Sequence, residues 1–290
     1  MNRTMLSVLA LVLLSTFAFA QGYPSKPVRI IGPFPAGAGG NIGGELAARA
    51  APDGYTLFMT SGSIVTANQH IYRKMPFDPA KDLVAITNVA SGPQVLVVTT
   101  AFPPRTIREF IALAKARPRE IAFGSAGFGT QTHLATENLI FTTGIDVLHV
   151  PYKGESLALT DVIAGQVQFA TPNLAAAINY IQQGKLRALG VTSGRRAPQL
   201  PEVPAIAESL PNFENLGWFG LMAPTGTPRD VIDKIHRDTE KVLALADIKS
   251  RFDGLGMAPV GNSPADFARA IREETERWAK IVRERKLVVD

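Results

Sequence analysis

Two glycine-rich segments of the chain combine residue types that could bind an anion. Each follows a short apolar run and leads into a helical pattern: "VRIIGPFPAGAGGNIGGELAARA" spans residues 28–50 and "IAFGSAGFGTQTHLATENLIF" spans residues 121–141. Backbone N–H groups that converge at a helix N-terminus attract phosphate or carboxylate groups. The segments are therefore candidate anion sites, although a tight turn that needs glycine for a positive φ would have the same composition.

The first segment has the wrong glycine spacing for a dinucleotide. Gly37, Gly39 and Gly43 are spaced G-x-G-x-x-x-G, whereas the dinucleotide fingerprint is G-x-G-x-x-G, and Ile42 occupies the position of its last glycine. We therefore interpret the likeness to a nucleotide cradle as incidental.

Complete catalytic motifs are missing from the sequence. It contains no H-E-x-x-H, no G-x-x-x-x-G-K-[ST] and no G-x-S-x-G, and in the nearest approach, "FGSAG", Phe123 replaces the first glycine. We therefore expect a protein that is not an enzyme and that needs no metal or cofactor. An exported α/β enzyme that uses His133 or Asp161 remains the alternative.

The histidines are too dispersed to predict a metal site, and structural roles are expected for most of them. His149 lies in an apolar run before a proline, and His236 lies among charges on an amphipathic helical pattern. His133 follows the second glycine loop by about one helical turn and is the histidine that we expect to line a binding site.

The N-terminus predicts export. "MNRTMLSVLALVLLSTFAFAQ" has a basic residue at Arg3, an apolar run of roughly 15 residues, and small residues at Ala18 and Ala20. This run is shorter than the about 20 apolar residues that cross a membrane. We predict a signal peptide over residues 1–20, cleaved near Ala20, and a periplasmic protein, and the lack of cysteine fits such a compartment.

Charge and composition limit the classes of partner. The formal net charge is +5 and the pI is near 9.5, but Lys and Arg are scattered along predicted helices rather than clustered. Nucleic acid is therefore not expected as a partner, and a mild positive field favours small anions.

Short apolar runs alternate with helical patterns along the chain, which is typical of α/β proteins with crossover helices. Thr106, Thr227 and Ser263 each precede a helical pattern with an acidic residue three positions later, so they are expected N-caps. No Ser/Gly linker divides the chain of 290 residues. A second lobe would have to be joined to the first by strands that cross between them.

Several blocks of the sequence resemble one family. They are "YPSKPVRIIGPFP", "GAGGNIGGELAARAAPDGYTL", "FDPAKDL", "FGSAGFGTQTHLATE", "VPYKGESLALTDVIAGQV", "LRALGVTSGRRAPQLPEVPAIAES" and "WFGLMAPTGTPRDVIDKI". In order and spacing they are similar to the solute-binding proteins of tripartite tricarboxylate transporters, the Bug or TctC-like family.

The resemblance implies a two-lobed α/β periplasmic solute-binding protein, with mixed or parallel sheets flanked by helices and crossing strands as the hinge. We expect lobe 1 over residues 21–122 and 222–290, and lobe 2 over residues 123–221. The protein would be a monomer that captures a small carboxylate-bearing molecule between the lobes and delivers it to the membrane components of a transporter.

The resemblance also implies that backbone amides and hydroxyls of two loops hold the ligand carboxylate. The amides of residues 127–131 are expected to form the main anion site, because the first turn of the helix that follows has no acidic residue to occupy them. The predicted ligand-binding residues are Phe34, Ala36, Gly37, Ser63, Asn68, Gly127, Gly129, Thr130, Gln131, His133 and Asn173.

Two departures from the family pattern concern this site. The block "PFP" joins "GAGGNIG" directly, as if one helix and one strand, about 30 residues, were absent between Pro35 and Ala36. The first ligand loop is therefore expected to be altered, and a receptor-derived protein that has lost binding and acts in signalling or assembly is a further alternative. Pro172 stands where relatives commonly have Asp, which favours ligands without an ammonium group.

Overall fold

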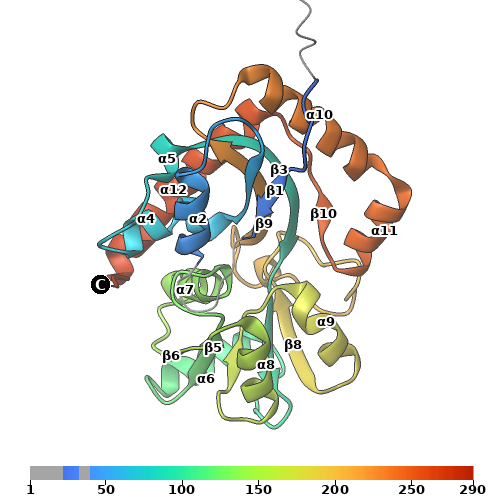
Figure 1. Cartoon of the computed structure of the whole chain (residues 1–290). Coiled ribbons are helices and arrows are strands. Elements are labelled where there is room, and N and C mark those ends of the chain that lie inside the picture. Colours follow the sequence, from blue (N-terminus) through green and yellow to red (C-terminus); the bar gives the residue numbers. More distant parts are fainter. Residues whose placement is uncertain (1–21, 33–39, 290) are drawn as a thin grey trace, which may run out of the picture.

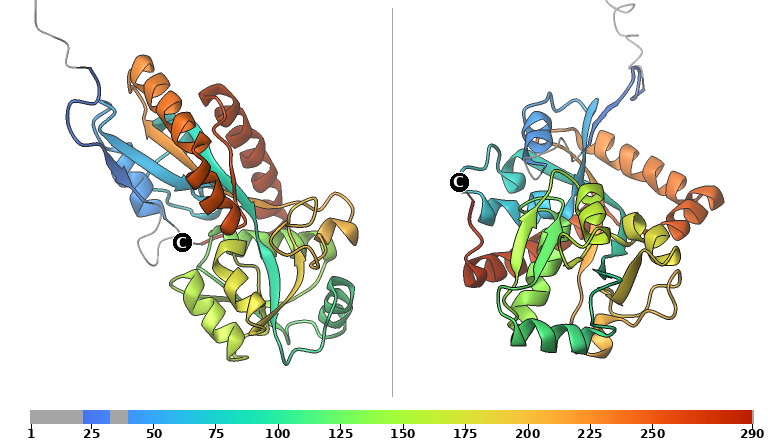
Figure 2. Two further views of the ribbon diagram at one scale, coloured as in Figure 1. Left: turned by 90° about the vertical axis from the view of Figure 1, so that its right-hand side faces the viewer. Right: turned by 90° about the horizontal axis from the view of Figure 1, so that it is seen from below.

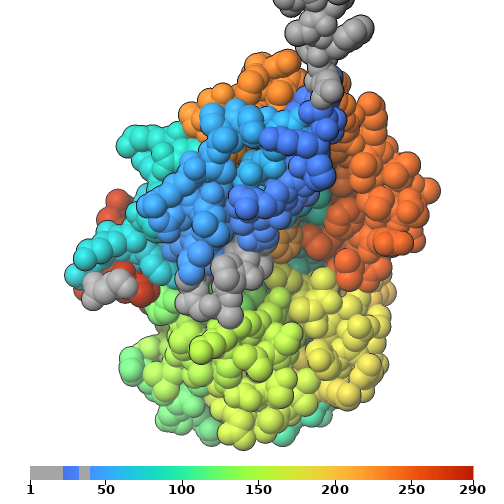
Figure 3. Space-filling view, in the orientation of Figure 1, coloured from blue at the N-terminus to red at the C-terminus, as the bar shows by residue number. Residues whose placement is uncertain are grey.

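The computed structural model describes residues 22–32 and 40–289, and it has two lobes that are each built on a five-stranded sheet (Figure 1). The strand orders are β1-β2-β9-β3-β10 and β6-β5-β7-β4-β8. Both sheets combine parallel and antiparallel neighbours, which confirms the predicted α/β class with mixed sheets. The space-filling view shows the first lobe, made from both ends of the described chain, above the second (Figure 3).

The first lobe places its long antiparallel strands in the middle of the sheet and its short strands at the edges. The strands are β1 (Arg29–Ile31), β2 (Thr56–Ser61), β3 (Leu83–Pro93), β9 (Leu216–Pro224) and β10 (Ala258–Pro259). The helices are α2 (Asn41–Ala48), α3 (Gly62–Thr66), α4 (Asn68–Ile71), α5 (Pro79–Asp82), α10 (Arg229–Ala244), α11 (Ala246–Gly254) and α12 (Pro264–Arg285).

Alternation along the strands supplies two hydrophobic cores in this lobe. Successive residues of a strand point to opposite faces of the sheet. Phe58 on β2 therefore packs in one core with Phe267 of α12, whereas its neighbour Leu57 packs in the other with Ile235 of α10. Helices on both faces thus bury the sheet.

The second lobe has helices on both faces of its sheet in the same way. Its strands are β4 (Val95–Thr99), β5 (Ala122–Ser125), β6 (Leu148–Pro151), β7 (Phe169–Ala170) and β8 (Leu186–Val191). Its helices are α6 (Ile107–Ala116), α7 (Gln131–Thr143), α8 (Glu155–Ile163), α9 (Leu174–Gln182) and the short η1 (Ile206–Glu208). Val97 of β4 packs in the core with α8 and α9, and Leu96 packs in the core with α6 and α7, so Val95 to Val98 form a continuous apolar run.

No helix within residues 22–32 and 40–289 combines the length and hydropathy needed to span a membrane.

Two of the three predicted helix caps are confirmed. Thr106 Oγ1 accepts a hydrogen bond from Glu109 N at 3.2 Å, and Ser263 Oγ accepts one from Asp266 N at 3.1 Å. The cap predicted at Thr227 is wrong, because this hydroxyl donates to Pro224 O at 2.7 Å and closes the turn before α10. Pro228 is the residue whose carbonyl begins that helix.

The chain crosses between the sheets at other residues than the predicted lobe boundaries, 122/123 and 221/222. β4 and α6 precede residue 123 but belong to the second sheet and its core, and β9 begins at Leu216 in the first sheet. One residue, Gln94, separates β3 from β4, so the first crossing falls there (Figure 2, left). The second crossing lies between β8 and β9.

Strand β1 is an edge strand whose surroundings are unusually apolar. Ile30 is 54% exposed, and Ile42 and Leu46, one turn apart on α2, are 46% and 58% exposed. A hollow of about 430 Å³ lies beside Ile30, between the sheet and α10. Both faces of this sheet edge therefore leave apolar side chains in contact with solvent.

Three buried polar residues join the two crossing segments, and we call Gln94, Thr192 and Asn215 the hinge cluster. The Thr192 hydroxyl accepts from Gln94 N at 2.8 Å and donates to Asn215 O at 2.6 Å. Thr192 N donates to Gln94 O, and Asn215 N donates to Thr192 O, both at 2.9 Å. These bonds hold the start of β4 against the end of β8 and the start of β9.

Replacing Thr192 by Val should lower the free energy of unfolding by about 1–3 kcal/mol, because it leaves a buried donor and a buried acceptor without their partner. Urea unfolding measures this loss. The control is Thr160→Val, which removes a hydroxyl from the exposed surface of α8. Equal losses in the two variants would contradict the importance assigned to the hinge cluster.

Candidate functional site

The loop between β5 and α7 meets the first lobe across the cleft. A Cβ on Gly129 would lie 2.5 Å from Asn68 Oδ1 and 3.2 Å from the Tyr72 ring, so this position accepts only glycine without rearrangement. The Tyr72 hydroxyl donates to Phe128 O at 3.1 Å, and Asn68 Nδ2 donates to Asn41 Oδ1 at 2.8 Å. The predicted site residues Asn68 and Gly129 are thus brought together.

The loop uses three of the five amides of residues 127–131, the predicted main anion site, in its own hydrogen bonds. Gly127 N donates to Ser125 Oγ at 3.1 Å, Gly129 N donates to His133 Nδ1 at 3.3 Å, and Thr130 N donates to Gly127 O at 3.3 Å. Within the described part of the chain, the N–H groups of Phe128 and Gln131 have no hydrogen-bond acceptor. An anion at this helix N-terminus would therefore have these two amides and the N–H of Thr132, which also has no acceptor among the described residues.

Thr130 is the N-cap of α7. Its hydroxyl accepts from His133 N at 3.5 Å and donates to Gly127 O at 2.7 Å, and the residue is buried. The hydroxyl is thus occupied in starting the helix. The first turn of α7 has no acidic residue, as the sequence indicates, so its positive end is not neutralised by the helix itself.

His133 lies beneath the loop instead of opening into the cleft. Its side chain is 1% exposed, its ring is stacked on the His149 ring with the centroids 4.2 Å apart, and the tilted Phe128 ring lies 4.5 Å away. Burial lowers the pKa of His133 well below its ordinary value, and electrostatic coupling with the neighbouring His149 ring and with the Arg285 guanidinium lowers it further. His133 is therefore neutral, and its Nδ1 positions the Gly129 amide.

His149 has the structural role that its sequence context indicates. Its Nε2 lies 2.7 Å from Ser125 Oγ, and its ring is stacked on Phe123 at 4.6 Å. Burial lowers the pKa of His149 to about 4. Ser125 in turn accepts from Gly127 N, so the histidine pair supports the loop from below.

Three amide side chains and a glycine form a polar floor between the lobes. A Cβ on Gly217 would lie 2.5 Å from Gln131 Oε1 and 3.0 Å from Asn173 Oδ1, and it would collide with the Gln94 amide. Gln131 Nε2 donates to Trp218 O at 2.7 Å, which fixes the amide across the cleft. The predicted residues Gln131 and Asn173 therefore lie together at this floor.

Ser63 lies on the other side of Gln131. It is buried near the start of α3, its hydroxyl is 3.3 Å from Ser61 Oγ, and it lines a narrow cavity together with Gln131 and Trp218. The indole of Trp218 and that of Trp278 both donate to Glu274, at 2.6 and 3.0 Å.

Glu155, the first residue of α8, was not predicted as a site residue. Its Oε1 accepts from Asn173 N at 2.5 Å and its Oε2 from Asn173 Nδ2 at 3.3 Å. Burial raises the pKa of this carboxyl, although the two bonds from Asn173 oppose the shift. Pro172 has no carboxylate where relatives commonly have Asp, but the carboxylate of Glu155 on α8 is bonded to the neighbouring Asn173.

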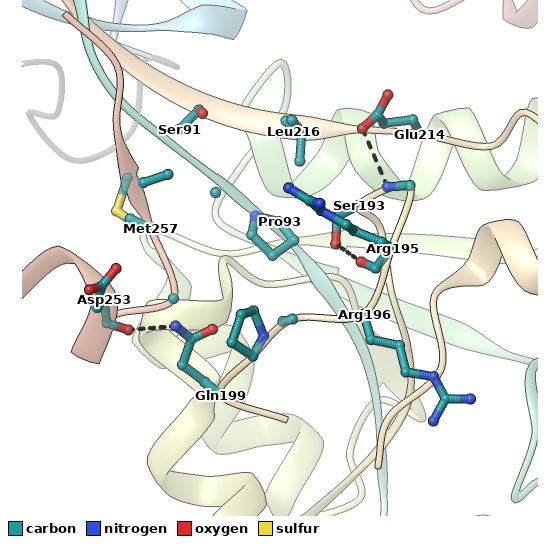
Figure 4. A pocket seen from close by; sticks show the side chains of 16 residues that line it. Ser91, Pro93, Ser193, Arg195, Arg196, Gln199, Glu214, Leu216, Asp253 and Met257 are labelled. Carbon is teal, nitrogen blue, oxygen red and sulfur yellow. Dashed lines mark hydrogen bonds between the residues drawn. The ribbon is translucent and has the colours of Figure 1, made fainter. Parts of the chain in front are cut away.

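A cavity of about 170 Å³ opens beside Glu155 and Gly217, and a larger one of about 840 Å³ adjoins it at the end of β3. Figure 4 shows the larger cavity, with Arg195 and Arg196 on one wall and Asp253 and Met257 on the other. None of the predicted site residues within residues 22–32 and 40–289 lines it. Phe34, Ala36 and Gly37 lie outside the described residues.

Two lobes joined by crossing strands, with a helix N-terminus and a polar floor between them, define a two-lobed binding protein. The family described as "Tripartite tricarboxylate transporter family receptor" (TctC) matches residues 27–287. The chain therefore belongs to this family.

Individual proteins agree with this assignment. The "UPF0065 protein in tcbD-tcbE intergenic region" of Pseudomonas sp. (strain P51) is 35% identical over 99% of this chain and 95% of its own. The solved structure "R. palustris Rpa4515 with adipate" is 30% identical, with a TM-score of 0.85 over 90% of this chain and 97% of that one. The periplasmic binding protein BugD is 28% identical, with a TM-score of 0.83 over 91% and 99% of the two chains.

The alignment with the Pseudomonas protein has more positions than this chain has residues. It extends over 320 positions, whereas 99% of a chain of 290 residues is about 287 residues. About 33 positions of the alignment therefore have no residue in this chain, which is close to the length of one helix and one strand.

The buried His149 should make stability depend on pH. The pKa of His149 is about 4 in the folded protein and has its ordinary value of 6.5 in the unfolded chain. As the pH falls below about 6.5, the unfolded chain therefore takes up a proton at His149 that the folded protein does not. The contribution of the neutral ring to the free energy of unfolding is complete above about pH 6.5 and is lost as the pH falls towards 4. This loss amounts to about 3 kcal/mol at most. In urea unfolding, His149→Gln should reduce the difference in stability between pH 7 and pH 4.5.

At pH 7 His149 is neutral, so the difference in stability between the parent and His149→Gln measures only the lost contacts with Ser125 and Phe123. The further change between pH 7 and pH 4.5 measures the effect of protonation. A variant with the parent's full pH dependence would contradict this role of His149.

Proposed function

We propose that the protein is a periplasmic receptor that captures a small carboxylate-bearing molecule between its lobes for a tripartite tricarboxylate-type transporter. The observation that carries this proposal is the N-terminus of α7, which meets the opposite lobe and has no acidic residue in its first turn. The N–H groups of Phe128, Gln131 and Thr132 have no acceptor among the described residues. Such a helix end favours a carboxylate.

Membership of the receptor family supports the same role, and one structural neighbour is described as solved with adipate. The family and its neighbours are solute-binding proteins, so we propose binding without turnover. We also propose a monomer, as the sequence predicts.

The proposed site combines backbone and side chains of both lobes. Gly127, Gly129 and Thr130 shape the helix N-terminus, and Gln131 and Asn173 form the floor. Asn68 and Ser63 approach from the first lobe, whereas His133 acts from below the loop. Phe34, Ala36 and Gly37 remain part of the proposal only through the resemblance.

Export is also a proposal. The signal peptide predicted over residues 1–20 lies outside the described residues. The family and the periplasmic neighbour BugD support a location in the periplasm.

The purified protein should be stabilised by small carboxylates. Adipate and malate serve as first probes, and a ligand at 100 times its Kd adds about 2.7 kcal/mol to the free energy of unfolding. Thermal shift assays measure this effect, with 1,6-hexanediol as the control that replaces each carboxylate of adipate by an alcohol. Equal stabilisation by adipate and hexanediol would contradict an anion site.

Long incubation with a bound carboxylate, followed by its recovery, separates receptor from enzyme. We expect the compound to be recovered unchanged. Steady conversion that is abolished by His133→Ala would favour the enzyme instead.

A further inference from the structure

His133 supports the loop before α7 through one ring nitrogen and faces a carboxylate with the other. Its Nδ1 accepts from Gly129 N at 3.3 Å, and its Nε2 lies 3.6 Å from Oε1 of Glu137, four residues further along α7. A neutral imidazole carries a single proton, so one ring nitrogen donates and the other accepts. The nitrogen that carries the proton therefore decides whether His133 can accept from Gly129.

Both contacts of the His133 ring favour the proton on Nε2. Nδ1 then offers a lone pair to the Gly129 amide, and the protonated nitrogen is the one beside the Glu137 carboxylate. With the proton on Nδ1, the Gly129 N–H would meet a second donor and the lone pair of Nε2 would face a negative charge. The distance of 3.6 Å is too long for a hydrogen bond, and Nε2 has no hydrogen-bond partner among the described residues, so Glu137 acts through its charge.

The negative charge of Glu137 depends on Arg285. The Glu137 side chain is 5% exposed, and burial raises the pKa of its carboxyl. Arg285 Nε donates to Glu137 Oε2 at 3.0 Å, and this bond and the charge of the guanidinium oppose the shift. A buried carboxylate is costly without such a partner. Arg285 therefore favours the ionised form of Glu137 beside the histidine.

The pair of Glu137 and Arg285 joins the two lobes. Glu137 belongs to α7 of the second lobe, and Arg285 is the last residue of α12 in the first lobe. Beside the pair, Leu134 of α7 is buried in one core with Ile71 of α4 and Trp278 of α12. The ion pair thus exists only where α7 and α12 pack together, and it connects this packing to the ligand loop.

We propose that Glu137 and Arg285 are positioning residues for the anion site: their ion pair keeps the proton of His133 on Nε2, and His133 Nδ1 then holds the Gly129 amide. Gly129 is in the left-handed region, with φ at 70°, so its orientation also directs the N–H groups on either side of it. Both residues act through His133 and not through the ligand. This inference rests on the proposed receptor function and adds to it a contact between the lobes that sets the shape of the loop.

NMR of the whole protein with isotope-labelled histidine measures the tautomer directly. The chain has four histidines, so long-range proton–nitrogen spectra are simple, and His133→Gln identifies the signals of His133. At neutral pH we expect its proton on Nε2 in the parent. A proton on Nδ1 in the parent would overturn the proposal without any need for a variant.

The variant Glu137→Gln keeps the shape of the side chain and removes its charge. It should move part of the His133 population to the tautomer with the proton on Nδ1 and speed hydrogen exchange at the Gly129 amide. In calorimetric titration it should lower the affinity for adipate about tenfold, the order of one hydrogen bond.

Variants of α12 test the partner of Glu137. Arg285→Leu should change the tautomer as Glu137→Gln does, whereas Arg285→Lys, which keeps the positive charge, should restore the tautomer of the parent. The matched control Glu284→Gln removes an exposed carboxylate of the same helix next to Arg285, and it should change neither the tautomer nor the affinity.

The tautomer distinguishes positioning from a purely structural contact between α7 and α12. If the pair only joins the lobes, Glu137→Gln and Arg285→Leu will lower stability in urea while His133 keeps its proton on Nε2, which overturns the proposal. Unchanged affinity for adipate in a variant with the altered tautomer also overturns it. The tautomer and the exchange at Gly129 are measured without ligand, so failure of adipate and malate to bind the parent would contradict the receptor function, while the tautomer still decides the role of the pair.

Discussion

The position of one lobe relative to the other depends on the Thr192 hydroxyl and on the two crossing segments that it joins. This hydroxyl accepts a hydrogen bond from Gln94 N on one crossing segment and donates one to Asn215 O on the other. The backbone of Thr192 is also hydrogen-bonded to that of Gln94 and of Asn215. A buried hydrogen bond is favourable only within a narrow range of distances and angles. The bonds of the hinge cluster therefore restrict where the two segments can cross. The floor of the cleft follows from this position, because Gln94 contacts Asn173, and Gly217 comes two residues after Asn215.

The loop before α7 is preformed to a large extent. His133 and Ser125 accept the amides of Gly129 and Gly127, and both acceptors are held by the stacked ring of His149. A loop that is already ordered loses little conformational freedom when a ligand binds. Few N–H groups of the loop then remain free to bind the ligand, but the internal hydrogen bonds of the loop hold them in place.

Local signals made part of this fold predictable from the sequence. The alternation of apolar runs and helical patterns indicated an α/β protein, and the caps at Thr106 and Ser263 depend on residues three positions apart. The glycine loop before α7 was also recognisable. Its internal bonds were not, because they depend on whether His133 turns towards Gly129 or towards the cleft.

Contacts between residues far apart in the sequence could not be predicted, because they depend on how the helices and strands pack together. Glu155 is the first residue of α8, whereas Asn173 is the N-cap of α9. Their bond exists only because α8 and α9 pack on the same face of the second sheet. The sequence shows an acidic residue at a helix start, which is common, and nothing that aims it at a cleft. The crossing points were misplaced similarly, since β4 looks like any apolar strand until its partners are known.

The edge position of β1 has a consequence for how this architecture changes during evolution. Backbone pairing in a sheet links only adjacent strands, so a segment lost beyond β1 leaves the register of β2, β9 and β3 intact. The apolar residues that such a loss would uncover lie beside β1, where Ile30, Ile42 and Leu46 are exposed. An edge of this sheet can therefore gain or lose a whole element while the strands that cross between the lobes keep their pairing.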